Sequence, residues 1–278
     1  MRAFEVVSSQ QRRWADERGS HADARGYLPT LAENLFAPLS ARALQEFGAG
    51  AGKELEDKMN EPAKMRALHS SSALVCNVFD HLRSTDPAAV SRVLGVTEPV
   101  KDVRLEAELR TGLRGIPPTL DVLLVGSDGW ARGVESKFTE PYQHYQRDVA
   151  FAGSYFAGGR ELWAAYGLPG CQRLAEAMTA GEIGYRHLDA AQLLKHVLGL
   201  RKYYSKSELM LLWYQVDAPE SEALAGEIED FARRVDPELG FRAITYQEVF
   251  DRLCHDPAAD AAHLEYLRSR YFTPAGFA

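Results

Sequence analysis

The chain has 278 residues, of which 46% are hydrophobic, and its formal net charge is −7. This size suffices for one large core, and the negative charge argues against a protein that coats nucleic acid through its overall charge. Three widely spaced cysteines favour buried thiols over a disulfide framework or a zinc site. We expect residues 1–278 to form a single domain, with an N-terminal helical elaboration over about residues 1–50.

In chain order, the first patterns are a helical region from about Pro38 to Leu82 and a strand over Asp102–Arg110. The strand alternates apolar and charged side chains, which is the period of a half-buried strand. The sequence contains no run of about 18 apolar residues, and its first residues are too polar for a secretion signal. These features predict a cytoplasmic protein without membrane contacts.

Two apolar segments follow, Pro118–Gly126 and Ala131–Phe138, and a short polar break separates them. Their pattern predicts a β-hairpin in a buried sheet. Three charged side chains stand in it: Asp121, Glu135 and Lys137. Because an isolated buried charge costs several kcal/mol, these three residues require a joint explanation.

The length of the hairpin loop decides whether the three charges meet. With a three-residue loop that ends on Gly129 in the left-handed conformation, Asp121 lies opposite Glu135, with Cβ atoms about 5 Å apart. Lys137 then shares their face. A two-residue turn would pair Asp121 with Ser136 and turn Glu135 to the other face. We expect the three-residue loop.

Two carboxylates at that distance repel each other, and either a raised pKa or a divalent cation relieves the repulsion. Oxygen ligands suit Mg²⁺, with Mn²⁺ as a substitute. A cation of this kind polarises a phosphate oxygen and lowers the pKa of water, and a nearby lysine can orient the water. The hairpin therefore points to hydrolysis of phosphodiester bonds.

The second half of the chain predicts the remaining layers. A polar and aromatic insertion precedes a helix over Leu188–Leu200, and Leu209–Tyr214 has the composition of a buried strand. An edge strand is expected over Phe241–Thr245. Covering helices are expected near three further segments: Glu220–Val235, Tyr246–Leu253 and Ala258–Tyr271.

Four cations lie in or after the predicted helix and are followed by Tyr203 and Tyr204: Lys195, His196, Arg201 and Lys202. Such a mixture of basic and aromatic residues is typical of a nucleic-acid contact. The alternative is an ordinary helix C-terminus, where the helix dipole favours cations. The sequence leaves both interpretations open.

Three runs together resemble a known family: His69-Ser70-Ser71-Ser72-Ala73-Leu74, Leu120-Asp121-Val122 and Glu135-Ser136-Lys137-Phe138-Thr139-Glu140. They look like the PD-(D/E)xK nuclease superfamily, and the resemblance to a bacterial branch described as restriction endonucleases spans most of the chain. Pro118 departs from the pattern, because it stands three places before Asp121 instead of next to it. The resemblance implies the restriction-endonuclease-like α/β fold, a central mixed β-sheet flanked by helices, with an N-terminal helical region and helical insertions.

The same resemblance implies a Mg²⁺-dependent deoxyribonuclease, in particular a restriction or defence endonuclease that leaves 5′ phosphates. Asp121 and Glu135, together with Glu54 and the carbonyl of Ser136, would hold the metal ion, and Lys137 would position the attacking water.

Further site residues follow from the family pattern. Glu106 is the alternative to Glu54 as the upstream acid, and Gln192 resembles the glutamine that some members place beside the active centre. The segment that begins at His69 would face the site, although its serines equally suit a helix cap.

Two other functions stay open. A catalytically idle relative would bind nucleic acid or a protein and keep the sheet without convergent charges. A hydrolase of small phosphorylated molecules would need a phosphate-binding loop, and the sequence contains no such motif. Because many restriction-type nucleases dimerise, a homodimer is a further expectation.

Overall fold

The computed structural model describes residues 2–50, 53–59, 61–113, 115, 117–143, 151–257 and 259–272. Its centre is a mixed sheet with the strand order β1-β2-β3-β4-β5. The strands are β1 Val100–Glu108, β2 Thr119–Gly126, β3 Trp130–Lys137, β4 Lys206–Trp213 and β5 Arg242–Thr245. Neighbours among β1, β2 and β3 are antiparallel, whereas β3, β4 and β5 run parallel. The predicted α/β class is confirmed, and β5 lies at an edge as expected.

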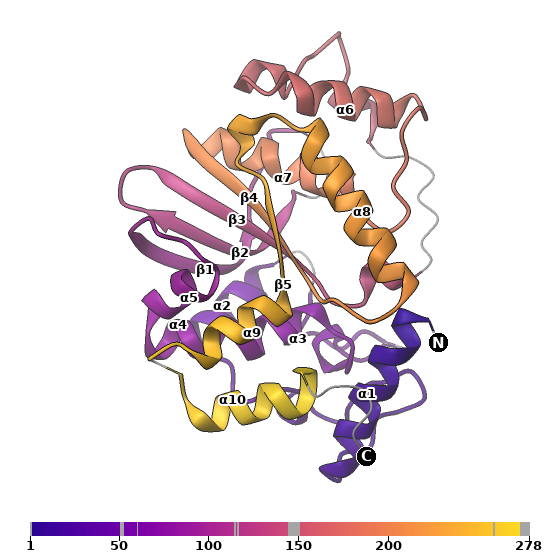
Figure 1. The fold of residues 1–278 in the computed structure, drawn as a ribbon, viewed down its shortest axis with the longest axis vertical. Helices are drawn as coiled ribbons and strands as arrows, with labels where there is room; N and C mark the ends of the chain where they lie inside the picture. Colours follow the sequence, from indigo (N-terminus) through magenta and orange to yellow (C-terminus); the bar gives the residue numbers. More distant parts are fainter. Residues whose placement is uncertain are drawn as a thin grey trace.

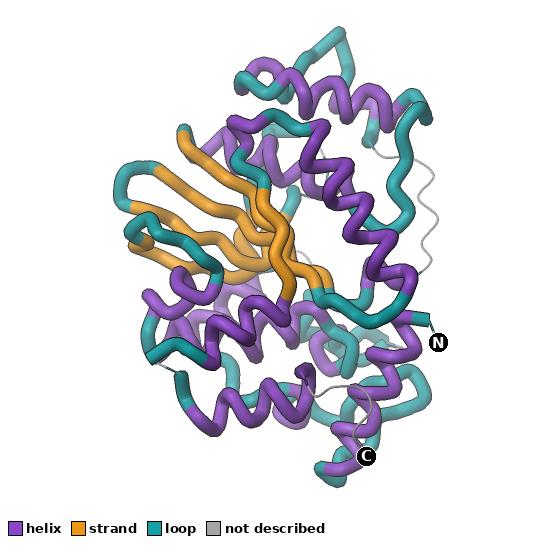
Figure 2. Tube along the Cα trace, in the orientation of Figure 1, coloured by secondary structure: helices purple, strands orange, loops and turns teal. Residues whose placement is uncertain are grey.

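Helices cover both faces of the sheet, which forms a single layer of strands in Figure 2. Figure 1 shows α6, α7 and α8 on one side and α2 to α5, α9 and α10 on the other. The helices are α1 Ala3–Glu17, α2 Ala41–Ala49, α3 Ser71–Val75, α4 His81–Thr85, α5 Pro87–Val93, α6 Pro169–Thr179, α7 Ala190–Tyr203, α8 Pro219–Arg234, α9 Tyr246–Cys254 and α10 Ala261–Leu267. Because α7 and α8 connect successive parallel strands by right-handed crossovers, they share one face. Within the described ranges, no helix is long and apolar enough to cross a membrane.

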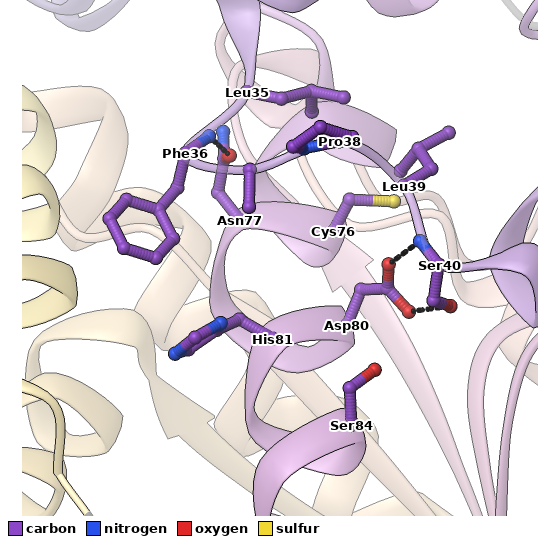
Figure 3. Close-up of a pocket in the computed structure, with 11 residues that line it drawn as sticks. Leu35, Phe36, Pro38, Leu39, Ser40, Cys76, Asn77, Asp80, His81 and Ser84 are labelled. Carbon is purple, nitrogen blue, oxygen red and sulfur yellow. Dashed lines mark hydrogen bonds between the residues drawn. The ribbon is translucent and has the colours of Figure 1, made fainter.

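A single π-helical turn, Cys76–Asp80, joins α3 to α4 without a break in the helix. The wider turn leaves the carbonyl of Asn77 to accept a hydrogen bond from His263 Nε2 at 2.6 Å. Asp80 accepts hydrogen bonds from the backbone N–H and the hydroxyl of Ser40, both at 2.8 Å. Figure 3 shows this pair beside a small pocket, which contains none of the charged residues of the hairpin.

The prediction of a helical region from Pro38 to Leu82 is wrong for the residues between α2 and α3. Helix α2 ends at Ala49, and α3 begins only at Ser71. Glycines close to the end of α2 and Pro62 interrupt helical hydrogen bonding, which explains the break. Glu54 therefore lies on a loop and not on a helix. The other predicted strands and covering helices are present, with ends shifted by a few residues.

The hairpin has the expected three-residue loop. Val125 pairs with Ala131 and Val122 with Val134, and Gly129 has a positive φ of 79°. This register, continued by one residue, places Asp121 opposite Glu135. The alternative pairing of Asp121 with Ser136 is excluded.

Candidate active site

Three carboxylates lie at the same level on three neighbouring strands, and we call them the carboxylate row. The register of β1 and β2 places Glu106 opposite Asp121, and that of β2 and β3 places Asp121 opposite Glu135. Side chains directly opposite each other in antiparallel strands have Cβ atoms about 5 Å apart. Glu106 has a φ of 49°, a left-handed conformation that costs a residue with a Cβ atom about 1 kcal/mol or more.

Burial, together with repulsion between the carboxylates, raises the pKa of two members of the row. Burial, Glu135 and Glu106 raise the pKa of Asp121 well above its usual value. Burial, Glu54 and Glu135 raise the pKa of Glu106 to about 7. Asp121 Oδ2 accepts a hydrogen bond from the backbone N–H of Ser136 at 2.7 Å, but among the described residues neither Asp121 nor Glu106 forms an ion pair with a cation.

Glu135, unlike Asp121 and Glu106, lies between two nitrogen-bearing side chains. Lys137 Nζ donates to Glu135 Oε1 at 2.6 Å, and His196 Nε2 lies 2.8 Å from Oε2. Burial would raise the pKa of Glu135, but Lys137 and His196 outweigh burial and lower this pKa to about 2. Burial likewise opposes the charge of Lys137, while Glu135, Glu140 and Asp121 raise the pKa of its ammonium. Both groups of the pair are therefore charged at neutral pH.

Helix α7 supplies two contacts to this pair. Gln192 Oε1 accepts a hydrogen bond from Lys137 Nζ at 2.8 Å, as its position in the sequence pattern suggested. His196 follows four residues later on the same helical face and is fully buried. The assignment of His196 to a surface that contacts nucleic acid is therefore wrong. The spacing from Gln192 was the signal in the sequence that could have placed His196 beside Glu135.

The other cations of α7 lie away from the carboxylate row. Lys195 Nζ is 5.4 Å from the ring centroid of Phe151, and Arg201 donates to the carbonyl of Glu238. Lys202 comes ten residues after Gln192, which corresponds to about 15 Å along the helix axis. Lys195 and Arg201 are half-buried and Lys202 is exposed, and neither of these two contacts involves the carboxylate row.

A comparison with protein families found one model, described as restriction endonuclease associating with ARP, that matches residues 8–272. The chain belongs to this family. Searches of the curated proteins and of the solved structures found no match. The span matched by the restriction endonuclease associating with ARP family contains the whole sheet, helix α7 and every member of the carboxylate row.

In this member of the family, both candidate upstream acids approach the row. Glu106 belongs to the row itself, while Glu54 reaches it from the loop after α2. Lys64 Nζ donates to Glu54 Oε1 at 3.0 Å, so the charge of Glu54 is partly balanced. Sequence reasoning placed Glu54 ahead of Glu106, whereas the strand register brings Glu106 closer to Asp121 in the sheet.

The donor chemistry of the row fits a hard divalent cation. Its donors are carboxylate oxygens, the ligands that Mg²⁺ and Mn²⁺ prefer, and two of its acids lack a cationic partner within the described part of the chain. A cation offsets this kind of local charge excess. However, no group of three or more His, Cys, Asp or Glu side chains among the described residues is arranged to hold a metal ion. Glu135 is already engaged by Lys137 and His196.

Proposed function

We propose that this chain is a divalent-cation-dependent nuclease of the PD-(D/E)xK type, which hydrolyses phosphodiester bonds, in the first place those of DNA. The observation that carries this proposal is the position of Lys137. Its ammonium lies beside Glu135, at the end of the row that includes Asp121. The family match supports a restriction or defence setting.

Each residue has a role that follows from its contacts. The ammonium of Lys137 orients the attacking water and stabilises the negative charge that develops on the phosphate. Gln192 fixes this ammonium through the hydrogen bond to Nζ. Asp121 and Glu106, assisted by Glu135, Glu54 and the carbonyl of Ser136, would hold Mg²⁺ or Mn²⁺. When bound, this cation would polarise the phosphate and activate water.

Two kinds of partner follow from the proposal. Nucleic acid is the substrate, and Lys195, Arg201 and Lys202 on the outside of α7 would contact its backbone away from the reacting phosphate. The family description also names an association with ARP. We propose that this chain likewise acts together with a partner protein, and that nuclease and partner serve one defence function.

One observation favours a second candidate function. Both oxygens of Glu135 lie within 2.8 Å of a nitrogen, one from Lys137 and one from His196. A carboxylate held in this way is typical of a structural ion pair as well as of a resting catalytic site. The second candidate is a catalytically idle relative that binds nucleic acid or a protein.

Cleavage of defined substrates separates the two functions. Purified protein is incubated with supercoiled plasmid, linear duplex and single strands in Mg²⁺, Mn²⁺ or a chelator. We expect cation-dependent nicking, with a loss of roughly 100-fold or more in Asp121→Asn and Lys137→Met. The control is Lys206→Met, because Lys206 is an exposed lysine at the far end of the sheet. Absence of cleavage in the wild type would favour the idle relative, whereas full activity in Asp121→Asn would reject the proposed site.

A further inference from the structure

A second pocket lies next to the carboxylate row and has a volume of about 340 Å³. Four segments form it: the loop at Tyr27, the loop at Glu54, the segment from Lys64 to the first turn of α3, and the residues after β3. Its volume is at the lower end of the range of about 300–1,000 Å³ that is typical of small-molecule sites. One nucleoside fits such a space, whereas a base-paired duplex does not.

The chain itself makes pocket and row neighbours, because the pocket lining includes Thr139, two residues after Lys137 at the end of β3. Glu54 lines the pocket, and its charge contributes to the raised pKa of Glu106. Glu140 also lines the pocket, and its charge contributes to the raised pKa of Lys137. A nucleotide whose phosphate lies at the row therefore has this pocket within reach of its base.

The pocket contains a hydroxyl that a ligand could bind. Ser72 lines it and is only 7% exposed, and its hydroxyl forms no hydrogen bond to the described residues. The helix cap does not require this hydroxyl, because Ser70 Oγ already accepts the hydrogen bond from the Ala73 N–H. Ser72 Oγ is not among the buried polar atoms that lack a partner, so water in the pocket can reach it. A polar atom of a ligand would replace this water as its partner.

The lining favours a base over a phosphate. Glu54 and Glu140 supply carboxylates to the lining. Lys64 pairs with Glu54, and Glu140 accepts a hydrogen bond from the backbone N–H of Phe138 through one of its two oxygens. Burial lowers the pKa of His69, so that its imidazole is mainly neutral at neutral pH. Carboxylates accept hydrogen bonds from the amino and imino groups of bases and repel phosphate. The rings of Tyr27 and His69, with centroids 6.4 Å apart, are two aromatic surfaces on which a base could stack.

We propose that this pocket receives the base of one unpaired nucleotide adjacent to the scissile phosphate, and that Ser72 and Glu140 bind the polar edge of this base. The inference rests on the proposed nuclease function and specifies its substrate class. Single strands, frayed ends and duplexes with an extruded nucleotide are substrates, and a continuous perfect duplex is a poor one.

The test uses Ser72→Ala, which removes the hydroxyl, and Ser72→Leu, which fills the pocket. Ser84→Ala is the matched control, because Ser84 is exposed at the far end of the same continuous helix. Binding of a fluorescent single-stranded oligonucleotide and of the matched perfect duplex is measured in the Lys137→Met background. Cleavage of both substrates is measured with Lys137 intact. Since the hydroxyl forms no hydrogen bond to the described residues, Ser72→Ala should leave the melting temperature nearly unchanged.

We expect the protein to prefer the single strand by roughly tenfold or more, and Ser72→Leu to abolish this preference by weakening single-strand binding. Ser84→Ala should behave as the parent protein. Equal binding of both substrates, or a preference that survives Ser72→Leu, would overturn the inference even if cleavage is observed. A Ser72-dependent preference without cleavage would uphold the pocket and reject the nuclease function.

Discussion

His196 Nε2 lies 2.8 Å from Oε2 of Glu135, and both side chains are almost inaccessible to solvent. The ring N–H is not aligned for a hydrogen bond to this oxygen, so the contact between the two side chains is electrostatic. On its other side, Glu135 accepts a hydrogen bond from Lys137. Glu135 is therefore fixed between a helix and its own strand, and its position determines that of the ammonium.

Loss of this contact should destabilise the fold. His196→Leu leaves Oε2 of the ionised Glu135 facing apolar atoms, while Lys137 still pairs with Oε1, and we expect a decrease of about 1–3 kcal/mol in the free energy of unfolding at pH 7. His196→Gln keeps a donor and should lose less. Because Glu135 has a pKa of about 2 instead of 4.5, its stabilising contribution is present above about pH 4.5 and disappears as the pH falls through 2. Urea unfolding measures the difference, and equal losses in both variants would contradict this account.

Glu106 should make the protein less stable at high pH when no cation is present. Its pKa is raised from 4.5 to about 7, so the folded state retains a proton that the unfolded state has already lost. Stability should therefore decrease as the pH rises from about 4.5 through 7. In chelator at pH 8, Glu106→Gln should be more stable than the wild type by up to about 3 kcal/mol. The two proteins should have similar free energies of unfolding at pH 4.5. If the difference between them did not change with pH, the placement of Glu106 in the carboxylate row would be contradicted.

Helix α7 approaches the end of β1 through a glycine. A Cβ atom on Gly199 would lie 2.7 Å from Leu109 Cβ and 2.8 Å from the Leu109 carbonyl oxygen. Gly199→Ala should therefore cost about 1–3 kcal/mol, despite the better helix propensity of alanine. In helix α8, Gly226→Ala meets no atom within 4 Å and should stabilise the protein by up to about 1 kcal/mol. Thermal unfolding of the two variants measures both effects. If Gly199→Ala and Gly226→Ala changed the melting temperature in the same direction, the close approach of α7 to Leu109 would be contradicted.

The hairpin and its register were predictable from local signals. The two apolar segments and Gly129 favoured the three-residue loop over a two-residue turn, and this loop length determines that Asp121 lies opposite Glu135. Gln192 was predictable from the family pattern, and the structure brings it to Lys137. These features depend on residues that are close in sequence or on a known spacing.

Other features depend on contacts that the sequence does not encode locally. The run of basic residues on α7 led to the assignment of His196 to the surface, and its spacing from Gln192 indicated only a shared helical face, not contact with Glu135 on β3. The positions of Glu54 and Glu106 relative to Asp121 depend on the end of α2 at Ala49 and on the pairing of β1 with β2. The pocket at Ser72 forms only when Tyr27 and Glu140 come together from distant segments.

Titration with Mn²⁺ tests the central claim, that the carboxylate row is a site for a divalent cation, most directly. By isothermal calorimetry, we expect saturable binding to the wild type and binding at least as tight to Lys137→Met, which lacks the competing ammonium. Affinity should fall roughly tenfold or more in both Asp121→Asn and Glu106→Gln, because each removes a negatively charged donor. No saturable binding to the wild type, or unchanged affinity in Asp121→Asn, would contradict the claim.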